Sequence, residues 1–418
     1  MTTATQTIPK GYKQTEIGVI PVDWDMNNLG DFVQIRSGES PSKFIMSKTG
    51  IPYFKVDQLN NSAKYQKETP YFVDVTNPVK AKSLVFPKRG AAIYQDKIRI
   101  LAQDSYMDTN LMTLTVDAKL DNEFLFYYLL NRGLSHIADT TSVPQINNKH
   151  IIPFKIIYPK SKLEQTAIAT VLSDTDALIE KLEKLIVKKK AVKQGAMQQL
   201  LTGKKRLPGF SGEWEVKKLK EISWYQEGPG VRTSQFTQSG VKLLNGTNIF
   251  MGKIDLNTTD RYISEKEAYG PYSHFMADEE DIVIASSGIT IDKFEEKIAF
   301  VIKRNLPFCM NTSTIRFKVD KDLLVDRFFY FFLMTTKFKK QIGAQATGSA
   351  QLNFGPSHLD KVIVDVPESK EEQTVIATVL SDMDAEIEGM EKSLKKYRQI
   401  KTGMMQQLLT GKIRLVKN

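Results

Sequence analysis

Apolar residues recur every three or four positions along two long stretches of the chain. In the second stretch they lie at Ile376, Leu380, Met383, Ile387, Met390, Leu394, Tyr397, Met404 and Leu408. Alternating steps of four and three form a heptad pattern, which is typical of one face of a long α-helix. Lys401 interrupts this pattern once, and no proline interrupts either stretch. We therefore expect two helices of roughly 38 residues, each about 57 Å long.

The two stretches are copies of one another. Residues 164–207 and 372–415 align without a gap at an offset of 208 and are identical at 29 of 44 positions, which indicates an internal duplication. A helix this long cannot bury its apolar face on one small domain, so we predict that the copies pack together along a seam. The seam residues are Ile168, Leu172, Ile179, Leu182, Ile186, Ile376, Leu380, Ile387, Met390 and Leu394. Contact with other chains is an alternative, because the first copy carries a second apolar stripe at Val171, Leu178, Leu185 and Val192.

The regions that precede the two helices are also related. Trp24 corresponds to Trp214, residues 50–59 to 240–249, residues 107–110 to 310–313, and residues 122–130 to 326–334. The predicted organisation is an N-terminal tail (1–20), a first globular region (21–160, here called head 1), a central long helix (161–206), a second globular region (207–367, head 2) and a C-terminal long helix (368–418).

Each head shows short β-type runs together with one strongly apolar helix. The runs expected as strands are 91–94, 111–116, 151–158, 281–286 and 314–319. The aromatic segments 122–130 and 326–334 are expected as buried helices, each opened by a polar cap. This alternation predicts an α/β (mixed α+β) fold for both heads.

Composition narrows the class of protein only slightly. The chain has 418 residues, of which 41% are hydrophobic and 25% charged, as in ordinary globular proteins. Its net charge of +10 favours an acidic partner. A single cysteine, Cys309, excludes an internal disulfide and fits a reducing cytoplasm. No apolar run is long enough to cross a membrane, and the N-terminus has no apolar signal core.

Catalytic motifs are missing or weak. An adenine methyltransferase needs an Asn/Asp-Pro-Pro-aromatic motif, and neither Asn77-Pro78-Val79 nor the segment 305–308 has the double proline. Asp281, Glu295 and Lys297 fit the letters of a metal-dependent nuclease, but we interpret them as a solvated surface. There is no phosphate-binding loop, and the four histidines lack metal-ligand spacing. His150 and His358 are equivalent in the repeat, which favours a structural role.

Two similar helices that carry two dissimilar heads suit a double-headed reader of a linear polyanion such as DNA. Arg and Asn side chains can read guanine and adenine edges in the major groove, and Lys can contact phosphates. The residues of these types that we predict as DNA contacts are Lys97, Arg99, Asn147, Asn148, Lys149, Arg232, Lys253, Arg261 and Lys293. For each of them an ordinary solvated surface is the alternative.

Several segments resemble the specificity subunits of Type I restriction-modification systems. They are TEIGVIPVDW (15–24), LPGFSGEWEVKKL (207–219), the two helices that begin with Glu-Gln, and the MQQLLTGK endings (197–204 and 405–412). The segment ending at Gln145-Ile146-Asn147 also resembles the end of that family's target recognition domains. The resemblance covers essentially the whole chain.

The resemblance implies two target recognition domains on an antiparallel coiled coil with pseudo-twofold symmetry. Each domain would read one half of a bipartite target on double-stranded DNA, while the helix pair sets the gap. The expected partners are two modification subunits, which methylate adenine with S-adenosylmethionine, and two restriction subunits, which use ATP and Mg²⁺. The chain itself would bind no cofactor or metal and would not be catalytic. An enzyme, or a coiled-coil scaffold that binds proteins without reading bases, is the alternative.

Overall fold

The computed structural model describes residues 8–61, 63–290, 293–345 and 351–415. It divides into two compact units, which are treated separately below. Unit 1 comprises Met1–Glu183 with Lys392–Asn418, and unit 2 comprises Lys184–Glu391. Each unit therefore contains one head and a part of both long helices, α3 (Lys162–Leu200) and α9 (Lys370–Leu408).

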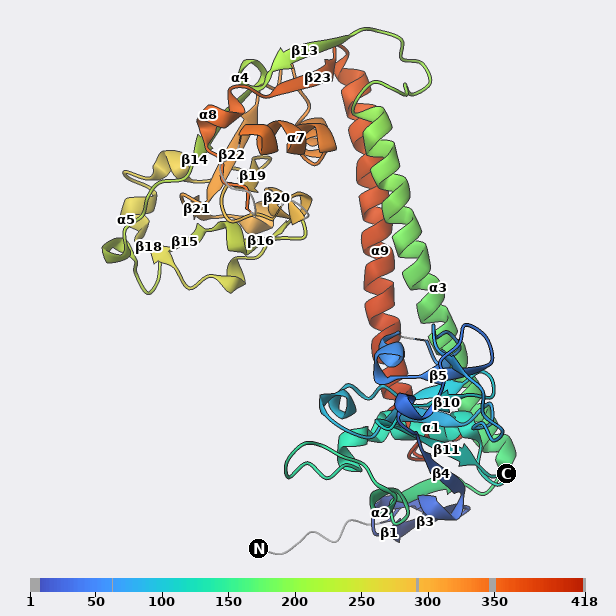
Figure 1. Cartoon of the computed structure of the whole chain (residues 1–418). Coiled ribbons are helices and arrows are strands. Elements are labelled where there is room, and N and C mark those ends of the chain that lie inside the picture. Colours follow the sequence, from blue (N-terminus) through green and yellow to red (C-terminus); the bar gives the residue numbers. More distant parts are fainter. Residues whose placement is uncertain (1–7, 62, 291–292, 346–350, 416–418) are drawn as a thin grey trace, which may run out of the picture. The chain divides into compact units, whose positions relative to one another are not determined.

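Head 1 is built from small sheets (Figure 1), and its buried apolar residues form more than one cluster. A five-stranded sheet has the order β4-β11-β8-β9-β6, with β4 (Val33–Ser37), β11 (Leu111–Val116), β8 (Leu84–Pro87), β9 (Arg99–Leu101) and β6 (Tyr65–Gln66). A three-stranded sheet has the order β10-β5-β7, with β10 (Tyr106–Met107), β5 (Ile51–Phe54) and β7 (Phe72–Val73). A further pair in head 1 is β3 (Trp24–Asn28) with β12 (Lys155–Pro159). The pair β1 (Tyr12–Thr15) with β2 (Gly18–Pro21) precedes it, in the segment predicted as the N-terminal tail.

Head 2 repeats this arrangement. Its four-stranded sheet has the order β14-β22-β19-β20, with β14 (Ser223–Glu227), β22 (Thr314–Val319), β19 (Ile282–Ala285) and β20 (Ile298–Phe300). Its three-stranded sheet has the order β18-β15-β21, with β18 (Tyr262–Ile263), β15 (Val241–Leu244) and β21 (Phe308–Met310). Two further pairs are β13 (Trp214–Lys218) with β23 (Ile363–Pro367), and β16 (Ile249–Phe250) with β17 (Lys253–Ile254). The short helices are α4 (Leu219–Ile222), α5 (Glu265–Ala268), α7 (Thr336–Gln345) and α8 (Pro356–Leu359).

The two heads share most of their topology, although the larger sheet of head 1 has a fifth strand, β6, parallel to β9, that has no counterpart among the described residues of head 2. In both three-stranded sheets the central strand has one parallel neighbour (β5 with β10, β15 with β21) and one antiparallel neighbour. In the larger sheets, all neighbouring strands are antiparallel along β4-β11-β8-β9 in head 1 and along β14-β22-β19-β20 in head 2. The predicted mixed α+β fold and the duplication of the heads are therefore confirmed.

A strongly apolar helix fills the core of each head. These helices are α1 (Asn122–Arg132) and α6 (Asp326–Leu333), and six consecutive residues of each are buried. The predicted polar cap exists in head 1, where the Asp121 carboxylate accepts the backbone N–H groups of Glu123 and Phe124. It is wrong for head 2, where the N-cap is Val325, whose N–H is bound instead by the side chain of Gln373.

Two predicted strands are wrong in whole or in part. Residues 91–94 belong to a short 3₁₀ helix, Ala91–Gln95, which lies between Gly90 (φ 81°) and Asp96 (φ 45°). These left-handed residues turn the chain too tightly for a strand. Residues 148–151 form the short helix α2 (Asn148–Ile151), so that β12 begins only at Lys155. Here apolar residues alone did not distinguish a buried helical turn from a strand.

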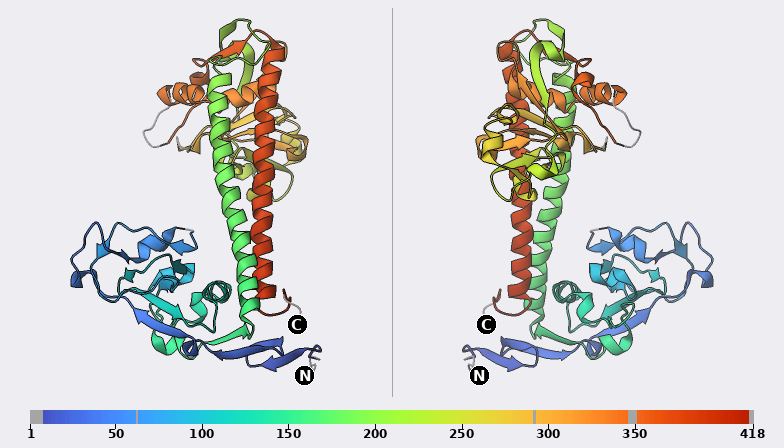
Figure 2. Two further views of the ribbon diagram at one scale, coloured as in Figure 1. Left: turned by 90° about the vertical axis from the view of Figure 1, so that its right-hand side faces the viewer. Right: turned by 90° about the vertical axis from the view of Figure 1, so that its left-hand side faces the viewer.

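The two long helices run antiparallel within each unit. In unit 1, Asp176 pairs with Lys401 and Glu183 with Arg398, whereas in unit 2, Lys189 pairs with Glu386 and Lys193 with Asp384. The residue number of the partner on α9 falls as the residue number on α3 rises, so the two helices run in opposite directions. In both views of Figure 2 the unit 2 segments of α3 and α9 lie side by side.

The long helices end earlier than the repeat, at Leu200 and Leu408. The Leu-Thr-Gly-Lys segments that follow turn back through a glycine of positive φ, Gly203 (67°) or Gly411 (71°). Glycine is the usual residue at this position because a Cβ atom strains the left-handed backbone. Each glycine also lies against the tryptophan that opens a head. A Cβ atom on Gly203 would lie 3.2 Å from Trp214, and one on Gly411 would lie 2.6 Å from Pro21 and 3.3 Å from Trp24.

We predict opposite effects for alanine at two glycines of the C-terminal repeat, Gly403 and Gly411. Gly411→Ala should lower the stability of unit 1 by about 2–4 kcal/mol, because it combines a left-handed backbone with overpacking against Pro21. Gly403→Ala, in the helix interior with open space at Cβ, should raise it by about 0.5–1 kcal/mol. Thermal unfolding of the two variants measures both effects. Equal shifts of the same sign would show that the turn is wrongly placed.

Candidate nucleic-acid interface

The Glu-Gln pair at the start of each long helix ties that helix to its head. The Gln165 side chain accepts the N–H of Asp121 (2.7 Å) and donates to the carbonyl oxygens of Pro159 (2.9 Å) and Lys119 (3.2 Å). In unit 2 the Gln373 side chain accepts the N–H of Val325 (2.8 Å) and donates to Pro367 (3.0 Å) and Leu323 (3.1 Å). Both glutamines are fully buried, so each satisfies backbone groups that would otherwise lack a partner.

The glutamate of the same pair receives an arginine from the end of the other long helix. Glu164 binds Arg414 in unit 1, and Arg414 also makes two hydrogen bonds to Asp23 (2.8 and 2.6 Å). Glu372 binds Arg206 in unit 2 through two bonds of 2.6 Å. Glu164 and Glu372 are each 1% exposed. Hydrogen bonds to Glu164 and Asp23 raise the pKa of Arg414. We call these bidentate pairs the arginine clamps.

The lysine that interrupts the heptad pattern forms an ion pair in each unit. Lys401 pairs with Asp176 (2.6 Å) and lies 5.7 Å from the ring of Tyr127. Its equivalent, Lys193, pairs with Asp384 (2.5 Å) and lies 5.3 Å from the ring of Phe331, the counterpart of Tyr127. Both lysines therefore make the same polar contact, at the place where α1 (unit 1) or α6 (unit 2) packs against the long helices.

The predicted seam residues differ in what they contact. Ile168 and Leu172 are buried in the core of head 1 together with Leu408 and Leu409. Ile376 and Leu380 are likewise buried in the core of head 2 together with Leu200 and Leu201. Ile186 and Ile387 are also buried, whereas Ile179, Leu182, Met390 and Leu394 are partly buried. The ends of the seam thus pack on the heads as well as on the partner helix.

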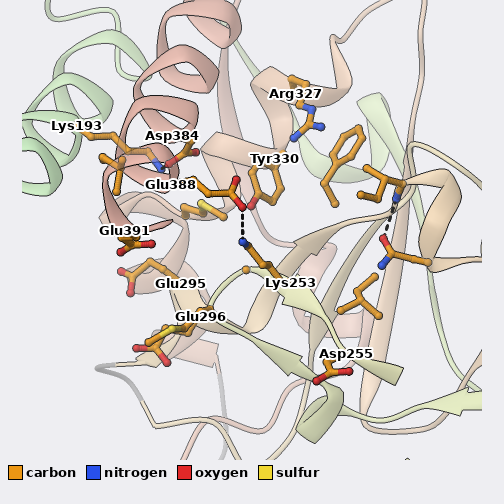
Figure 3. A pocket seen from close by; sticks show the side chains of 18 of the residues that line it. Lys193, Lys253, Asp255, Glu295, Glu296, Arg327, Tyr330, Asp384, Glu388 and Glu391 are labelled. Carbon is orange, nitrogen blue, oxygen red and sulfur yellow. Dashed lines mark hydrogen bonds and ion pairs between the residues drawn. The ribbon is translucent and has the colours of Figure 1, made fainter. Parts of the chain in front are cut away.

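A cavity of about 870 Å³ lies in unit 2 between head 2 and the long helices (Figure 3). Its walls mix both signs of charge: Lys190, Lys193, Lys253, Arg304 and Arg327 face Asp255, Glu295, Glu296, Asp384, Glu388 and Glu391. The ammonium group of Lys253 lies 2.8 Å from a carboxylate oxygen of Glu388. Six carboxylates against five cations do not suit a polyanion, so we assign this cavity to the attachment of head 2 rather than to DNA.

A second set of equivalent residues lies where three loops of each head meet, and we call it the three-loop surface. In head 1 it consists of residues 55–58, 88–90 and 108–110, and in head 2 of residues 245–248, 286–288 and 311–313. Two backbone hydrogen bonds hold the loops together in head 1, from Asp108 N to Phe54 O (2.9 Å) and from Lys88 N to Asn110 O (2.8 Å). The same two bonds recur in head 2, from Asn311 N to Leu244 O (3.1 Å) and from Ser286 N to Ser313 O (2.9 Å).

A glycine keeps a further strand end against each three-loop surface. Gly38 follows β4 and Gly228 follows β14, at an offset of 190. A Cβ atom on Gly38 would lie 2.0 Å from the carbonyl oxygen of Asp108, and one on Gly228 would lie 2.3 Å from that of Asn311. Only glycine permits this close approach of two backbones. The geometry of the surface is therefore common to both heads, while its side chains differ.

In head 2 the surface borders a polar hollow of about 390 Å³. Hydroxyl, amide and charged side chains line it, together with one glycine: Asn245, Gly246, Thr247, Asn248, Thr258, Thr259, Asp260, Arg261, Ser287 and Ser313. The Asn311 amide donates to Asn245 Oδ1 (2.9 Å), and Gly246 N donates to Ser313 Oγ (3.0 Å). These groups resemble the donors and acceptors that proteins offer to base edges.

Three of the predicted DNA contacts are held by the chain itself. Arg99 donates to the carbonyl oxygens of Leu59 and Ile98 and to Asn61, and burial lowers its pKa. Lys97 donates to the side chain of Asn60, and Lys253 pairs with Glu388. Lys97 and Arg99 are therefore bound to their neighbouring loop, whereas the Lys253–Glu388 pair is exposed.

The other predicted DNA contacts are exposed: Asn147, Asn148, Lys149, Arg232, Arg261 and Lys293. Of these, Arg261 lines the polar hollow and stacks on Phe236 at 5.5 Å. Asn147 to Lys149 adjoin Ile146, whose N–H binds Lys88 O (2.8 Å) next to the three-loop surface of head 1. The sequence prediction did not include Lys55, Lys88, Arg89 and Ser287, which lie on the three-loop surfaces. Two of the three loops could have been found in the sequence, because residues 50–59 and 107–110 were matched to head 2 by the repeat.

The interpretation of the nuclease-like residues as a solvated surface is wrong for Asp281. This residue is 3% exposed and pairs with the equally buried Arg316 at 3.3 Å, and burial raises its pKa. Lys297 donates to the carbonyl oxygens of Gly246 (3.1 Å) and Ile249 (2.7 Å). All of these groups are bound internally. Across residues 8–61, 63–290, 293–345 and 351–415, no group of three or more His, Cys, Asp or Glu side chains has the geometry to hold a metal ion.

The two equivalent histidines have the structural role predicted for them. His150 Nδ1 accepts the backbone N–H of Asn147 (3.1 Å) at the start of α2, and His358 Nδ1 accepts that of Gly355 (2.9 Å) at the start of α8. Each ring thereby satisfies a backbone donor at a helix start. In the part of the chain that the structure describes, no helix is long and apolar enough to span a membrane.

Comparisons with known proteins agree with this architecture. A family model described as the Type I restriction modification DNA specificity domain matches residues 21–189 and again 211–396. The chain belongs to this family and carries two copies of the domain. The specificity subunit of the Type I restriction enzyme MjaVIII of Methanocaldococcus jannaschii is 26% identical over 417 residues, covering 96% of this chain and 95% of the relative. The putative MjaX specificity subunit of the same organism is 25% identical over 439 residues, covering 97% of both chains.

Solved structures show the same fold. The crystal structure of a Type I restriction-modification S subunit from M. genitalium superimposes with a TM-score of 0.57 at 18% identity, covering 92% of this chain and 96% of the other. A chain from a study of complex assembly and conformational transition in a type I system gives a TM-score of 0.60 at 14% identity, covering 94% and 99%. The chain is thus a specificity subunit of the Type I class, which determines the DNA target and is not itself catalytic.

Proposed function

We propose that each head reads one half of a bipartite target on double-stranded DNA, and that the helix pair sets the gap and docks the modification subunits. The observation that carries this proposal is the three-loop surface. The same two backbone hydrogen bonds and the same close glycine contact recur in both heads, but the side chains that the surface presents are different. A shared frame with different side chains is what two recognition domains for two different sequences require.

The long helices support the second part of the proposal. Both have 39 residues, and the arginine clamps fix the start of each against the end of the other. In unit 2, helix α3 leaves Leu185 and Val192 exposed, at 40% and 49%, seven residues apart. An apolar stripe of this spacing suits a helix of a partner protein. We assign it to the modification subunits, two of them per specificity subunit.

The cofactors of the complex belong to its other subunits in this proposal. S-adenosylmethionine would be bound by the modification subunits, and ATP and Mg²⁺ by two restriction subunits. Within the described residues of this chain the charged groups of the cavity in Figure 3 are paired with one another or line the attachment of head 2. We therefore expect this chain to contribute recognition and assembly only.

Methyl transfer from labelled S-adenosylmethionine tests the proposal. The target would first be found by sequencing methylated sites in cells that contain the system. We expect methylation of a target duplex only when this chain and a modification subunit are mixed, and a large loss when either half of the target is scrambled. Transfer by this chain alone would contradict the proposal. A complex that forms but ignores the scrambling would favour a protein scaffold without base readout.

A further inference from the structure

The two three-loop surfaces differ systematically in charge. Where head 1 has Lys55, Lys88 and Arg89, the equivalent residues of head 2 are Asn245, Ser286 and Ser287. The backbone hydrogen bonds that define this equivalence are the same in both heads, whereas the side chains at these positions differ in charge. Three cations in one head thus correspond to three neutral side chains in the other.

The cations of head 1 are available to a ligand. Arg89 is exposed, and its backbone pairs with Gln145 in an isolated bridge. Lys55 lies over the ring of Tyr71 at 3.7 Å, and Lys88 is half-buried. Among the ion pairs of the described residues none involves these three side chains. Burial lowers the pKa of Lys88, while Asp108 acts in the opposite direction.

Two carboxylates also lie on the surface of head 1, but the chain itself provides donors for them. Asp57 accepts a hydrogen bond from the side chain of Gln58 (2.7 Å), and Asp108 accepts the N–H of Asn110 (2.8 Å). Among the described residues that line the hollow of head 2, only Arg261 and Asp260 are charged, and they are of opposite sign. Head 1 therefore offers several cations to a polyanion, whereas head 2 offers mainly neutral donors and acceptors.

We infer that the two three-loop surfaces hold DNA differently: in head 1, Lys55, Lys88 and Arg89 contact phosphates while the other side chains of that head read its half of the target, whereas the hollow of head 2 contacts base edges mainly with neutral side chains. This inference rests on the proposed function and assigns it to particular surfaces. Phosphate contacts release counterions, so each one makes binding more dependent on salt without adding sequence preference. Base-edge contacts do the reverse, because they add preference without releasing counterions.

The test is the salt dependence of DNA binding by the full chain assembled with its modification subunits. Affinity for a target duplex and for a scrambled duplex would be measured over a series of salt concentrations. The variants are Arg89→Gln, the triple variant Lys55→Gln, Lys88→Gln and Arg89→Gln, and the pair Thr247→Ala and Ser287→Ala in head 2. Lys119→Gln is the matched control: it is an exposed lysine of head 1 whose carbonyl oxygen binds Gln165, at the start of α3.

We expect Arg89→Gln to reduce the slope of log affinity against log salt by about one, and the triple variant by about three, equally on both duplexes. Lys119→Gln should leave the slope unchanged. Thr247→Ala and Ser287→Ala should leave the slope unchanged and lower the preference for one half of the target about tenfold. Thermal unfolding shows whether the triple variant is folded, and Arg89→Gln alone suffices if it is not.

An unchanged slope in Arg89→Gln, or a change equal to that of Lys119→Gln, would overturn the inference. So would a change of slope in the head 2 variants without loss of preference. If the unsubstituted complex fails to distinguish the target from the scrambled duplex, the proposed function itself is wrong. If it does distinguish them while the slopes do not move, only the division of work between the heads is wrong.

Discussion

Replacing Arg414 by glutamine is expected to destabilise unit 1 by about 3–5 kcal/mol. The substitution leaves Glu164, which is 1% exposed, without its bidentate partner. A buried carboxylate that loses its counter-charge retains the full cost of leaving water. For a unit of this size, such a loss lowers the midpoint of thermal unfolding by about 6–20 °C. Arg206→Gln should have the same effect in unit 2 through Glu372.

Arg398→Gln is the control for the arginine clamp. Arg398 also pairs with a glutamate, Glu183, but the two side chains are 60% and 40% exposed. An exposed ion pair contributes less than about 1 kcal/mol. The double variant Arg414→Met with Glu164→Met should recover most of the stability, because no unpaired charge remains buried. Equal unfolding midpoints for Arg414→Gln and Arg398→Gln would contradict the role given to the clamp.

The long helices and the duplication could be predicted because both are periodic features of the sequence. The seam residues were visible for the same reason. The clamps could not be predicted, because Arg414 meets its buried partner, Glu164, only when the start of α3, 250 residues earlier in the chain, packs against the segment that follows α9. The helix ends were missed because the Leu-Thr-Gly-Lys segment continues the identity between the copies beyond the helix itself.

The candidate DNA contacts show where residue type is insufficient. Arg99 has the chemistry to read guanine, yet its guanidinium group binds backbone carbonyl oxygens beside it. Ser287 has an unremarkable side chain, yet it lines the polar hollow. Whether Arg99 or Ser287 lies on a surface that is open to DNA depends on strand pairing between distant segments, such as β8 with β11. The repeat matched residues 107–110 with 310–313, but only the strand register brings these loops to Lys88 and Ser286.

Exchange of a whole head is expected to change one half of the DNA target completely. Residues 24–159 would be replaced by the corresponding segment of a relative with another target, because the pairing of β3 with β12 brings Trp24 opposite Pro159 and closes head 1 at these points. The donor should retain an aromatic residue at position 127, since Tyr127 lies against Asp176 and Lys401 of the long helices. The three-loop surface of head 2 is untouched by this exchange.

The reciprocal exchange of residues 214–367 is the matched control, because β13 and β23 close head 2 in the same way. It should change the other half of the target and leave the first half intact. Methyl transfer should persist in both chimaeras, since the long helices that we assign to the modification subunits are unchanged. Loss of all methylation in a chimaera that still assembles would argue against this assignment.

Sequencing the methylated sites in cells that carry the head 1 chimaera tests the central claim most directly. The claim is that one head reads one half of the target, and it predicts a methylated motif with one new half, one parental half and the parental gap. A motif in which both halves change together, or in which neither changes, would contradict it.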